Sequence, residues 1–204
     1  MKAANYYDVF TSCILIYHLR DDVNHRLSCP YPQGSFEEKL FRKCEIDTVQ
    51  WHLEDLIRDP EIDPSEALAL KRRIDLLNQS RTDCVEAIDD HFLFMHQHRP
   101  VQSGARHNTE SIGWAIDRLS ILALKIYHIE AELKRLSASE NHRAACISRR
   151  SLLCRQLDDL LQSIDWLNED IAAGVKKIKI YRQVKMYNDP EFNPVLYNQR
   201  EAQL

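Results

Sequence analysis

The chain has 204 residues, 44% of them hydrophobic and 28% charged, a balance typical of one folded domain with a sizeable core rather than of a disordered chain. Its formal net charge of −4 provides no general electrostatic attraction to nucleic acid or to an anionic membrane, so we expect neither as a partner. Only 4 glycines and 7 prolines occur, too few for a turn-rich β-sandwich or a glycine-rich phosphate loop, and the composition favours helices.

Hydrophobic spacing predicts the first three helices in chain order. The first covers about residues 5–23 and is followed by CPYPQGS, whose prolines and glycine cannot continue a helix. A capping box of Ser35 and Glu38 begins the second, at about 36–58. The third starts after Asp63, with Pro64 in the first helical position, and continues to about residue 96.

Two further helices follow a polar connection, HQHRPVQSGARHN. Thr109 or Asn108 is the expected cap of the fourth, which reaches about residue 136 and is apolar on nearly every face from 119 to 124, as a central helix would be. Ser139 begins the fifth, where apolar residues alternate three and four apart from Leu153 to Tyr181, the spacing of a coiled-coil seam. We therefore predict an all-α, mostly antiparallel bundle of about five long helices. It forms one domain over residues 1–204, with an irregular tail at 185–204.

Cysteine usage and the amino terminus bear on where the protein works. The six cysteines include no C-x-x-C pair, and several fall at helix-core spacing, so we interpret them as reduced, buried thiols of a cytoplasmic protein. The segment MKAANYYDVFTSCILIYHLRDD lacks the plan of a signal peptide, because its apolar run is short and no small-residue cleavage site follows. No run of about 18 apolar residues is free of charges, so we expect no membrane insertion.

Polar side chains interrupt the apolar stripes of three predicted helices. Arg81 falls within the stripe of the third helix, one turn after Leu77, and Asn78 borders it. Similar polar bands occur on the second helix (Glu45, Thr48, His52, Asp55, beside Trp51 and Glu54), on the third (Asp75, Asn78, Arg81, Thr82, Glu86, Asp89) and on the fourth (Asp117, Arg118, Ser120, Lys125, His128). Three helices thus carry polar bands along surfaces that should be partly buried.

One interpretation of these bands is structural. An isolated buried charge is costly, so each inward charge should find a partner on a neighbouring helix. Such bridges would set the register of the helices, pairing Arg81 with Glu54 or Asp117, and Lys125 with Asp75 or Glu86.

The other interpretation is a polar pocket between the second, third and fourth helices. There Arg81, Arg118 and Lys125 would receive an anionic ligand, the arginines through bidentate contacts and the lysine as a point charge. The predicted ligand-binding set is completed by Asn78, Asp117, His52 and Asp55. Glu54 or Asp75 would be the acid or base of any reaction.

Nine histidines justify a test for metal chemistry. A di-iron bundle needs a Glu-x-x-His motif on two helices, and no carboxylate precedes His18, His52, His91, His128 or His142 by three residues. His52 and Asp55 form a possible pair of ligands, which is weak support for a site. We predict no metal and no cofactor.

Several stretches resemble a bacterial family. These are IDTVQWHLEDLIRDP, KRRID with NQSRTD and EAIDD, AIDRLSILALKIYH, and the late EDIAAG, YRQVKMYNDP and NPVLY. The family is known as domain of unknown function 4254. The resemblance covers nearly the whole chain and implies a helical cytoplasmic protein without an established activity, associated with genes for lipopolysaccharide and other surface-glycan assembly. The family pattern includes the positions of Trp51, Glu54, Asp55, Arg58, Asp75, Asn78, Arg81, Asp83, Asp117, Arg118 and Lys125.

Two functional hypotheses follow. In the first, the bundle binds or processes an anionic small molecule, phosphorylated or sugar-linked, in surface-glycan biosynthesis. In the second, it is a non-catalytic interaction or scaffold protein that dimerises through its carboxy-terminal helix. Convergence of Arg81, Arg118 and Lys125 on one cavity would favour the first hypothesis.

Overall fold

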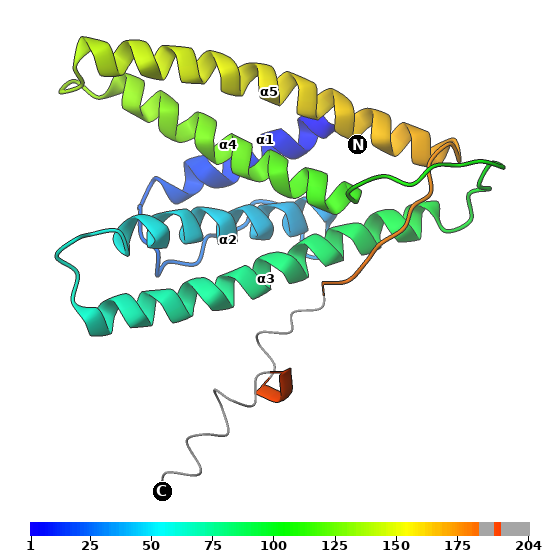
Figure 1. The fold of residues 1–204 in the computed structure, drawn as a ribbon, viewed down its shortest axis with the longest axis horizontal. Helices are drawn as coiled ribbons and strands as arrows, with labels where there is room; N and C mark the ends of the chain where they lie inside the picture. Colours follow the sequence, from blue (N-terminus) through cyan, green and yellow to red (C-terminus); the bar gives the residue numbers. More distant parts are fainter. Residues whose placement is uncertain (184–189, 193–204) are drawn as a thin grey trace, which may run out of the picture.

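The computed structural model describes residues 1–183 and 190–192. Five long helices form an all-α bundle, as the sequence predicts, and the described residues contain no strand (Figure 1). The helices are α1 (Ala3–Tyr17), α2 (Phe36–Leu56), α3 (Pro64–His96), α4 (Ile112–Lys134) and α5 (Glu140–Ala172), with a short 3₁₀ turn, η2 (Pro190–Phe192). Apart from that turn, the predicted tail at 185–204 lies outside the described residues.

Three of the predicted helix starts are confirmed by their capping hydrogen bonds. The Ser35 hydroxyl accepts from the backbone N–H of the third helical residue, Asp63 accepts from two backbone N–H groups with Pro64 in place, and Ser139 caps α5. The predicted cap of α4 was wrong, because Ser111 rather than Thr109 or Asn108 accepts from Trp114 N at 3.2 Å.

Two helices end earlier than the sequence predicts. The chain leaves α1 at Tyr17, well before residue 23. At the other end, α5 stops at Ala172, where Gly174 has a φ of +71° and approaches the 100–102 backbone so closely that a Cβ would lie 2.2 Å from Pro100 O. The predicted seam therefore ends at Ile171. Ile178 and Tyr181 lie in the extended segment beyond it.

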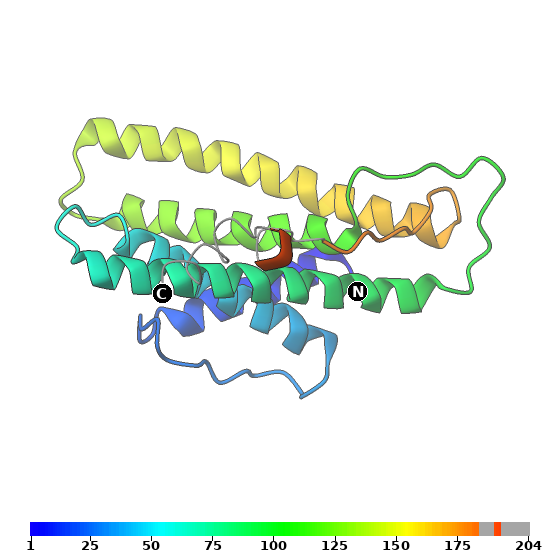
Figure 2. The same cartoon turned by 60° about the horizontal axis from the view of Figure 1, so that its bottom comes forward.

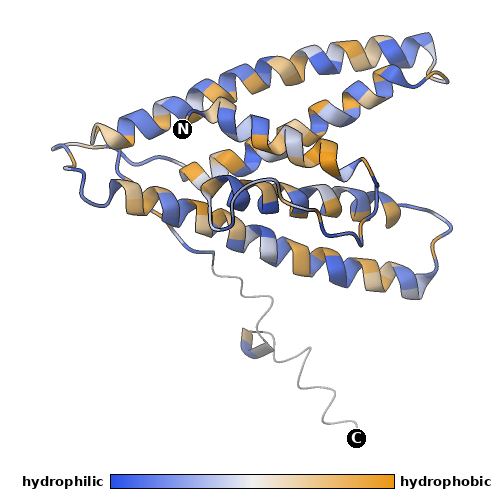
Figure 3. Ribbon diagram, turned by 180° about the vertical axis from the view of Figure 1, so that it is seen from behind, coloured by the Kyte–Doolittle hydropathy of each residue, from blue (hydrophilic) through white to orange (hydrophobic). Residues whose placement is uncertain are grey.

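Helix α4 is the centre of the bundle, as predicted, because it packs against each of the other four helices. It runs beside α5 over most of its length, while α2 and α3 form a second pair, and the turned view shows α4 between α5 and α3 (Figure 2). Within the seam, Ile164 and Ile171 are buried, so α5 makes the long intramolecular contact that its spacing indicates. Hydrophobic and hydrophilic residues alternate along the helices, as is typical of a bundle (Figure 3).

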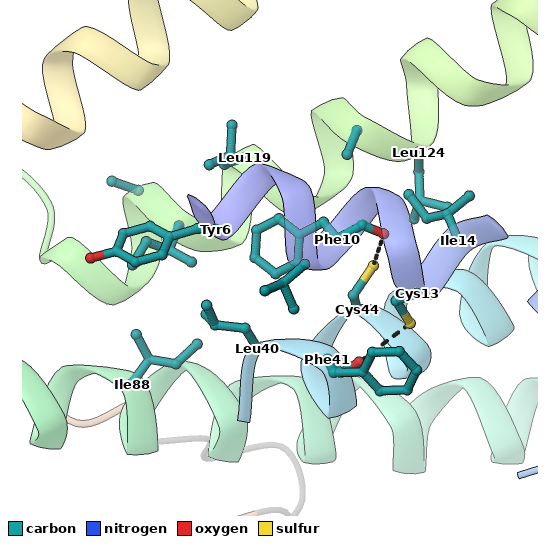
Figure 4. Packing of buried hydrophobic residues seen from close by; sticks show 14 of the residues in the cluster. Tyr6, Phe10, Cys13, Ile14, Leu40, Phe41, Cys44, Ile88, Leu119 and Leu124 are labelled. Carbon is teal, nitrogen blue, oxygen red and sulfur yellow. Dashed lines mark hydrogen bonds between the residues drawn. The ribbon is translucent and has the colours of Figure 1, made fainter. Parts of the chain in front are cut away.

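Most of the core comes from α1, α2 and α4, and both α3 and α5 add residues to it; Ile88 of α3 is among those drawn in Figure 4. Two buried thiols take part in it: Cys13 Sγ donates to Phe41 O at 3.4 Å, and Cys44 Sγ donates to Phe10 O at 3.6 Å. All six cysteines fall in the described part of the chain and none forms a disulfide. Among the described helices, none is long and apolar enough to cross a bilayer.

Candidate functional site

Four charged side chains meet between α2, α3 and α4, and we call them the charge network: Lys43, Asp47, Arg81 and Asp117. Arg81 donates from Nε to Asp117 Oδ1 at 2.8 Å and from Nη2 to Asp117 Oδ2 at 2.6 Å. Lys43, whose side chain is fully buried, forms ion pairs with Asp47 and with Asp117, the latter at 2.8 Å. Ser120 Oγ donates to Asp47 Oδ2 at 2.6 Å. Arg81 thus points inward because the Asp117 carboxylate accepts two hydrogen bonds from its guanidinium.

This pairing decides between the two partners expected for Arg81. Asp117 is the partner, whereas Glu54 lies 3.8 Å from Arg58 instead. With both carboxylates ionised, the two cations and two anions of the charge network sum to zero. A buried charge is costly unless an opposite charge balances it, so this neutral network agrees with the structural interpretation of Arg81.

The two carboxyl groups of the network differ in their pKa. Burial raises the pKa of Asp47, the charge of Lys43 opposes it, and the charge of Asp117 adds to the rise. Burial acts on Asp117 in the same direction, but hydrogen bonds from Arg81 and the charge of Lys43 outweigh it and lower the pKa of Asp117. Environments that separate the pKa values of two neighbouring carboxyl groups are characteristic of functional sites, although ion-pair networks produce them too.

A cavity of about 270 Å³ opens beside the network, along α2 and against Arg81 of α3 and Ile121 of α4. Asp47 lies in its wall, and Asp47 Oδ1 is buried without a hydrogen bond from the described residues, 3.4 Å from Arg81 Nε. Trp51 adds an aromatic wall, and its indole ring stacks on the His128 ring with centroids 4.8 Å apart. The other polar groups of this cavity are Gln50, Glu54, Asp55 and Arg58.

A larger cavity of about 570 Å³ lies on the α4–α5 side. Arg81, Arg118 and Lys125, the three cations of the predicted ligand site, all line it. Arg118 also donates to Glu110 Oε1 at 2.8 Å, and Lys125 has no ion-pair partner among the described residues. Arg81 and Ile121 line both cavities, so the two flank the same guanidinium.

Other predicted residues lie away from these cavities. Asp75 is more than half exposed and pairs with Lys71. The expected bridges from Lys125 to Asp75 or Glu86 were wrong, since Glu86 pairs with Arg182 at 3.1 Å. Each of these carboxylates has a nearer partner than Lys125. Asp75 pairs with a lysine of its own helix, and Glu86 pairs with an arginine of the segment after α5. Asn78 accepts from Gln50 Nε2 at 2.8 Å and so touches the wall of the smaller cavity.

His52 is placed in a different environment from the one predicted. Instead of forming a pair with Asp55, which binds Arg58 at 2.8 Å, it meets two other histidines. Each of the three rings of His18, His52 and His128 offers one nitrogen, and these three nitrogens lie within 4.8 Å of one another. We call these three residues the histidine cluster.

Sequence reasoning missed both Lys43 and Asp47, and it missed the histidine cluster. The sequence does contain a signal for the first pair. Asp47 lies four residues after Lys43 and seven before Glu54, so the three share one face of α2, which leads from the core to the cavity. The histidine cluster has no such signal, because its members come from three different segments. A search for motifs within single helices could not bring them together.

The sequence model of a family described as protein of unknown function (DUF4254) matches residues 37–180. The chain belongs to this family. The match contains the whole charge network and the residues of both cavities, together with His52 and His128, whereas His18 and Asp21 precede it. Searches of curated proteins and of solved structures found no match to the chain.

Proposed function

We propose that this protein binds a small molecule with an anionic group, phosphorylated or sugar-linked, in the two cavities that flank Arg81. The observation that carries the proposal is the convergence of Arg81, Arg118 and Lys125 on the larger cavity. Lys125 is the strongest single indication, because it lines this cavity and forms no ion pair with a described residue. Three carboxylate residues line the same cavity, and two of them, Asp117 and Glu110, are paired with the arginines; the third is Asp159. An anion bound beside Lys125 would give this side chain a charged partner.

Arg81 is prepared for such a contact. Asp117 holds its Nε and Nη2 in a bidentate pair, which fixes the plane of the guanidinium, and Nη1 makes no hydrogen bond to the described residues. A side chain already held in place loses little conformational freedom when it binds a ligand. Arg118 has its own partner, Glu110, at the edge of the cavity, so it contributes less free charge.

The smaller cavity suits the uncharged part of such a molecule. Trp51 offers apolar contact, while Gln50, Glu54 and Asp47 offer donors and acceptors for hydroxyl groups. We also infer that Asp47 is the best placed acid or base, because this residue lines the cavity and its carboxyl group has a raised pKa and a buried oxygen without a hydrogen bond to the described residues. Of the two carboxylates suggested by the sequence, Glu54 lines this cavity, whereas Asp75 is exposed elsewhere.

A thermal-shift screen with sugar phosphates and nucleotide sugars tests the proposal. This choice of ligands follows the resemblance to cytoplasmic proteins linked to surface-glycan assembly. At least one should raise the melting temperature of the protein, and K125Q should remove most of that rise. The matched control is K134Q, which neutralises another exposed lysine of α4 that lines neither cavity. If no ligand in the set shifts the protein, or if K125Q and K134Q respond alike, the proposal is wrong.

One observation favours the alternative of an interaction protein. The seam of α5 is used inside the bundle, yet Leu152 and Trp166 remain 49% and 55% exposed on that helix. They lie 14 residues apart, about 21 Å along the axis and within about 40° of the same side. A partner on this outer face would cover both. Analytical ultracentrifugation of the wild type and of W166K tests it: a dimer that W166K dissociates supports this alternative, and a monomeric wild type removes its homodimer form.

A further inference from the structure

The histidine cluster brings together three side chains that could bind a metal ion. His18 follows the last residue of α1, His52 belongs to α2 and His128 to α4, so three separate segments supply one imidazole each. Aromatic neighbours fix the rings: His52 stacks on Tyr17 with centroids 5.0 Å apart and His128 stacks on Trp51. Rings held in place before binding are what a precise coordination site needs.

Hydrogen bonding specifies which nitrogen of His18 is available. His18 Nδ1 lies 2.7 Å from Ile14 O, a carbonyl that can only accept, so Nδ1 carries the proton and Nε2 keeps its lone pair. A ring N–H donated to a backbone carbonyl is the usual outer contact of a metal-binding histidine.

This nitrogen forms a hydrogen bond with His52 Nε2, in which His52 is the donor, and a metal ion would take the place of the shared proton. His18 Nε2 and His52 Nε2 are 3.2 Å apart. Two imidazole nitrogens bound tetrahedrally to one zinc ion at 2.0–2.1 Å would be separated by about 3.3 Å. The observed spacing therefore suits two ligands of one ion.

His128 supplies the third nitrogen. Its Nε2 is buried and makes no hydrogen bond to the described residues, which is costly for a polar atom unless something binds it.

A carboxylate stands next to these nitrogens. Asp21 Oδ1 lies 3.8 Å from His52 Nε2. Asp21 is the only non-glycine residue in the described part of the chain with a positive φ, 53°, a left-handed conformation that costs free energy for a residue with a Cβ. This turn after α1 places the carboxylate beside His52.

We propose that His18, His52 and His128 bind one divalent transition-metal ion of the zinc class, with Asp21 or a water molecule in the fourth position. A set of three neutral imidazoles suits zinc, and also cobalt, nickel and iron, rather than magnesium or calcium, which prefer oxygen ligands. Three protein ligands with one position left open are the pattern of catalytic rather than structural zinc sites. The site goes beyond the proposed anion-binding function, since none of its residues lines either cavity beside Arg81.

Titration of the chelator-treated full chain with Zn²⁺, followed by calorimetry, tests the proposal. One equivalent should bind, and H52F or H128F should weaken binding by more than the roughly 10–100-fold typical of losing an outer contact alone. Phenylalanine keeps a ring for the stacks on Tyr17 and Trp51 while removing the ligand nitrogen. The matched control is H91F, because His91 is likewise half-buried and stacks on an aromatic ring, Phe36, at 4.1 Å. It should bind Zn²⁺ like the wild type.

Two spectroscopic readouts complete the test. Co²⁺ should give the intense visible bands of a four-coordinate ion without thiolate charge-transfer bands. Thiolate bands would place the metal at a cysteine and would overturn the proposal. One such cysteine is Cys146, whose Sγ is 3.3 Å from His142 Nε2. In wild-type protein with ¹⁵N-labelled histidine, Zn²⁺ should shift the ring signals of His18, His52 and His128, a measurement that needs no variant. Absence of one-equivalent binding, unchanged affinity in H52F and H128F, or unshifted ring signals would each refute the site.

Discussion

Replacing Arg81 with methionine tests the charge network directly. Methionine retains most of the apolar stem of arginine but removes both hydrogen bonds to Asp117. With both carboxylates ionised, the variant would leave Lys43 facing Asp47 and Asp117, a net charge of −1 in a buried position. We therefore expect R81M to be destabilised.

The size of the effect follows from burial and from the remaining partners. Breaking a fully buried ion pair by removing one partner costs about 3–5 kcal/mol. Arg81 is 27% exposed, and Asp117 keeps Lys43 at 2.8 Å, so the cost should fall to about 2–3 kcal/mol. For a chain of this length, each kcal/mol lowers the melting temperature by about 2–4 °C, which predicts a decrease of roughly 4–12 °C.

A double-mutant cycle distinguishes charge balance from simple loss of packing. D117N removes one negative charge, so R81M/D117N again has one cation and one anion, Lys43 and Asp47. Urea unfolding of the wild type, both single variants and the double variant should show that R81M/D117N recovers at least about 1 kcal/mol relative to R81M. If R81M unfolds like the wild type, or if the two single losses add in the double variant, the reasoning about the network is refuted.

Three other substitutions probe the bundle. I164D places an unpaired charge at a position 2% exposed and should cost more than about 3 kcal/mol by urea unfolding; an unchanged midpoint would disprove the packing of the α5 seam. In G113A the new Cβ would lie 2.7 Å from Val85 O and 2.6 Å from Asp89 Oδ1, so calorimetry should show a loss of about 1–3 kcal/mol, whereas a gain would mean that α3 and α4 separate freely. Hydrogen bonds from Ser65 and Glu66 lower the pKa of Asp63, the cap of α3. The stabilising contribution of Asp63 is therefore present above its pKa in the unfolded chain, about 3.9, and is lost as the pH falls through the lower pKa of the folded protein. Asparagine keeps the cap without the charge, so the melting temperature of D63N should depend less on pH below 4 than that of the wild type, and equal slopes would contradict the assignment.

The sequence by itself determined the helices and most of their starts. Apolar spacing and capping residues act over one or two turns, so Ser35, Asp63 and Ser139 could be recognised without knowledge of the fold. The same local information showed that Arg81 points inward and that α4 is central, because a polar residue in an apolar stripe and a helix apolar on all faces are visible in one dimension.

Only the tertiary structure decided which side chains meet. Arg81 pairs with Asp117 rather than Glu54, and Lys125 pairs with neither Asp75 nor Glu86. The histidine cluster is formed by side chains from three segments. Even the end of α5 depends on a distant contact, since Gly174 must pass the backbone at Pro100. The physical reason is that contacts between helices depend on the rotation and axial position of each helix, which the packing of the whole core sets together, whereas periodicity and caps depend on neighbours in the chain.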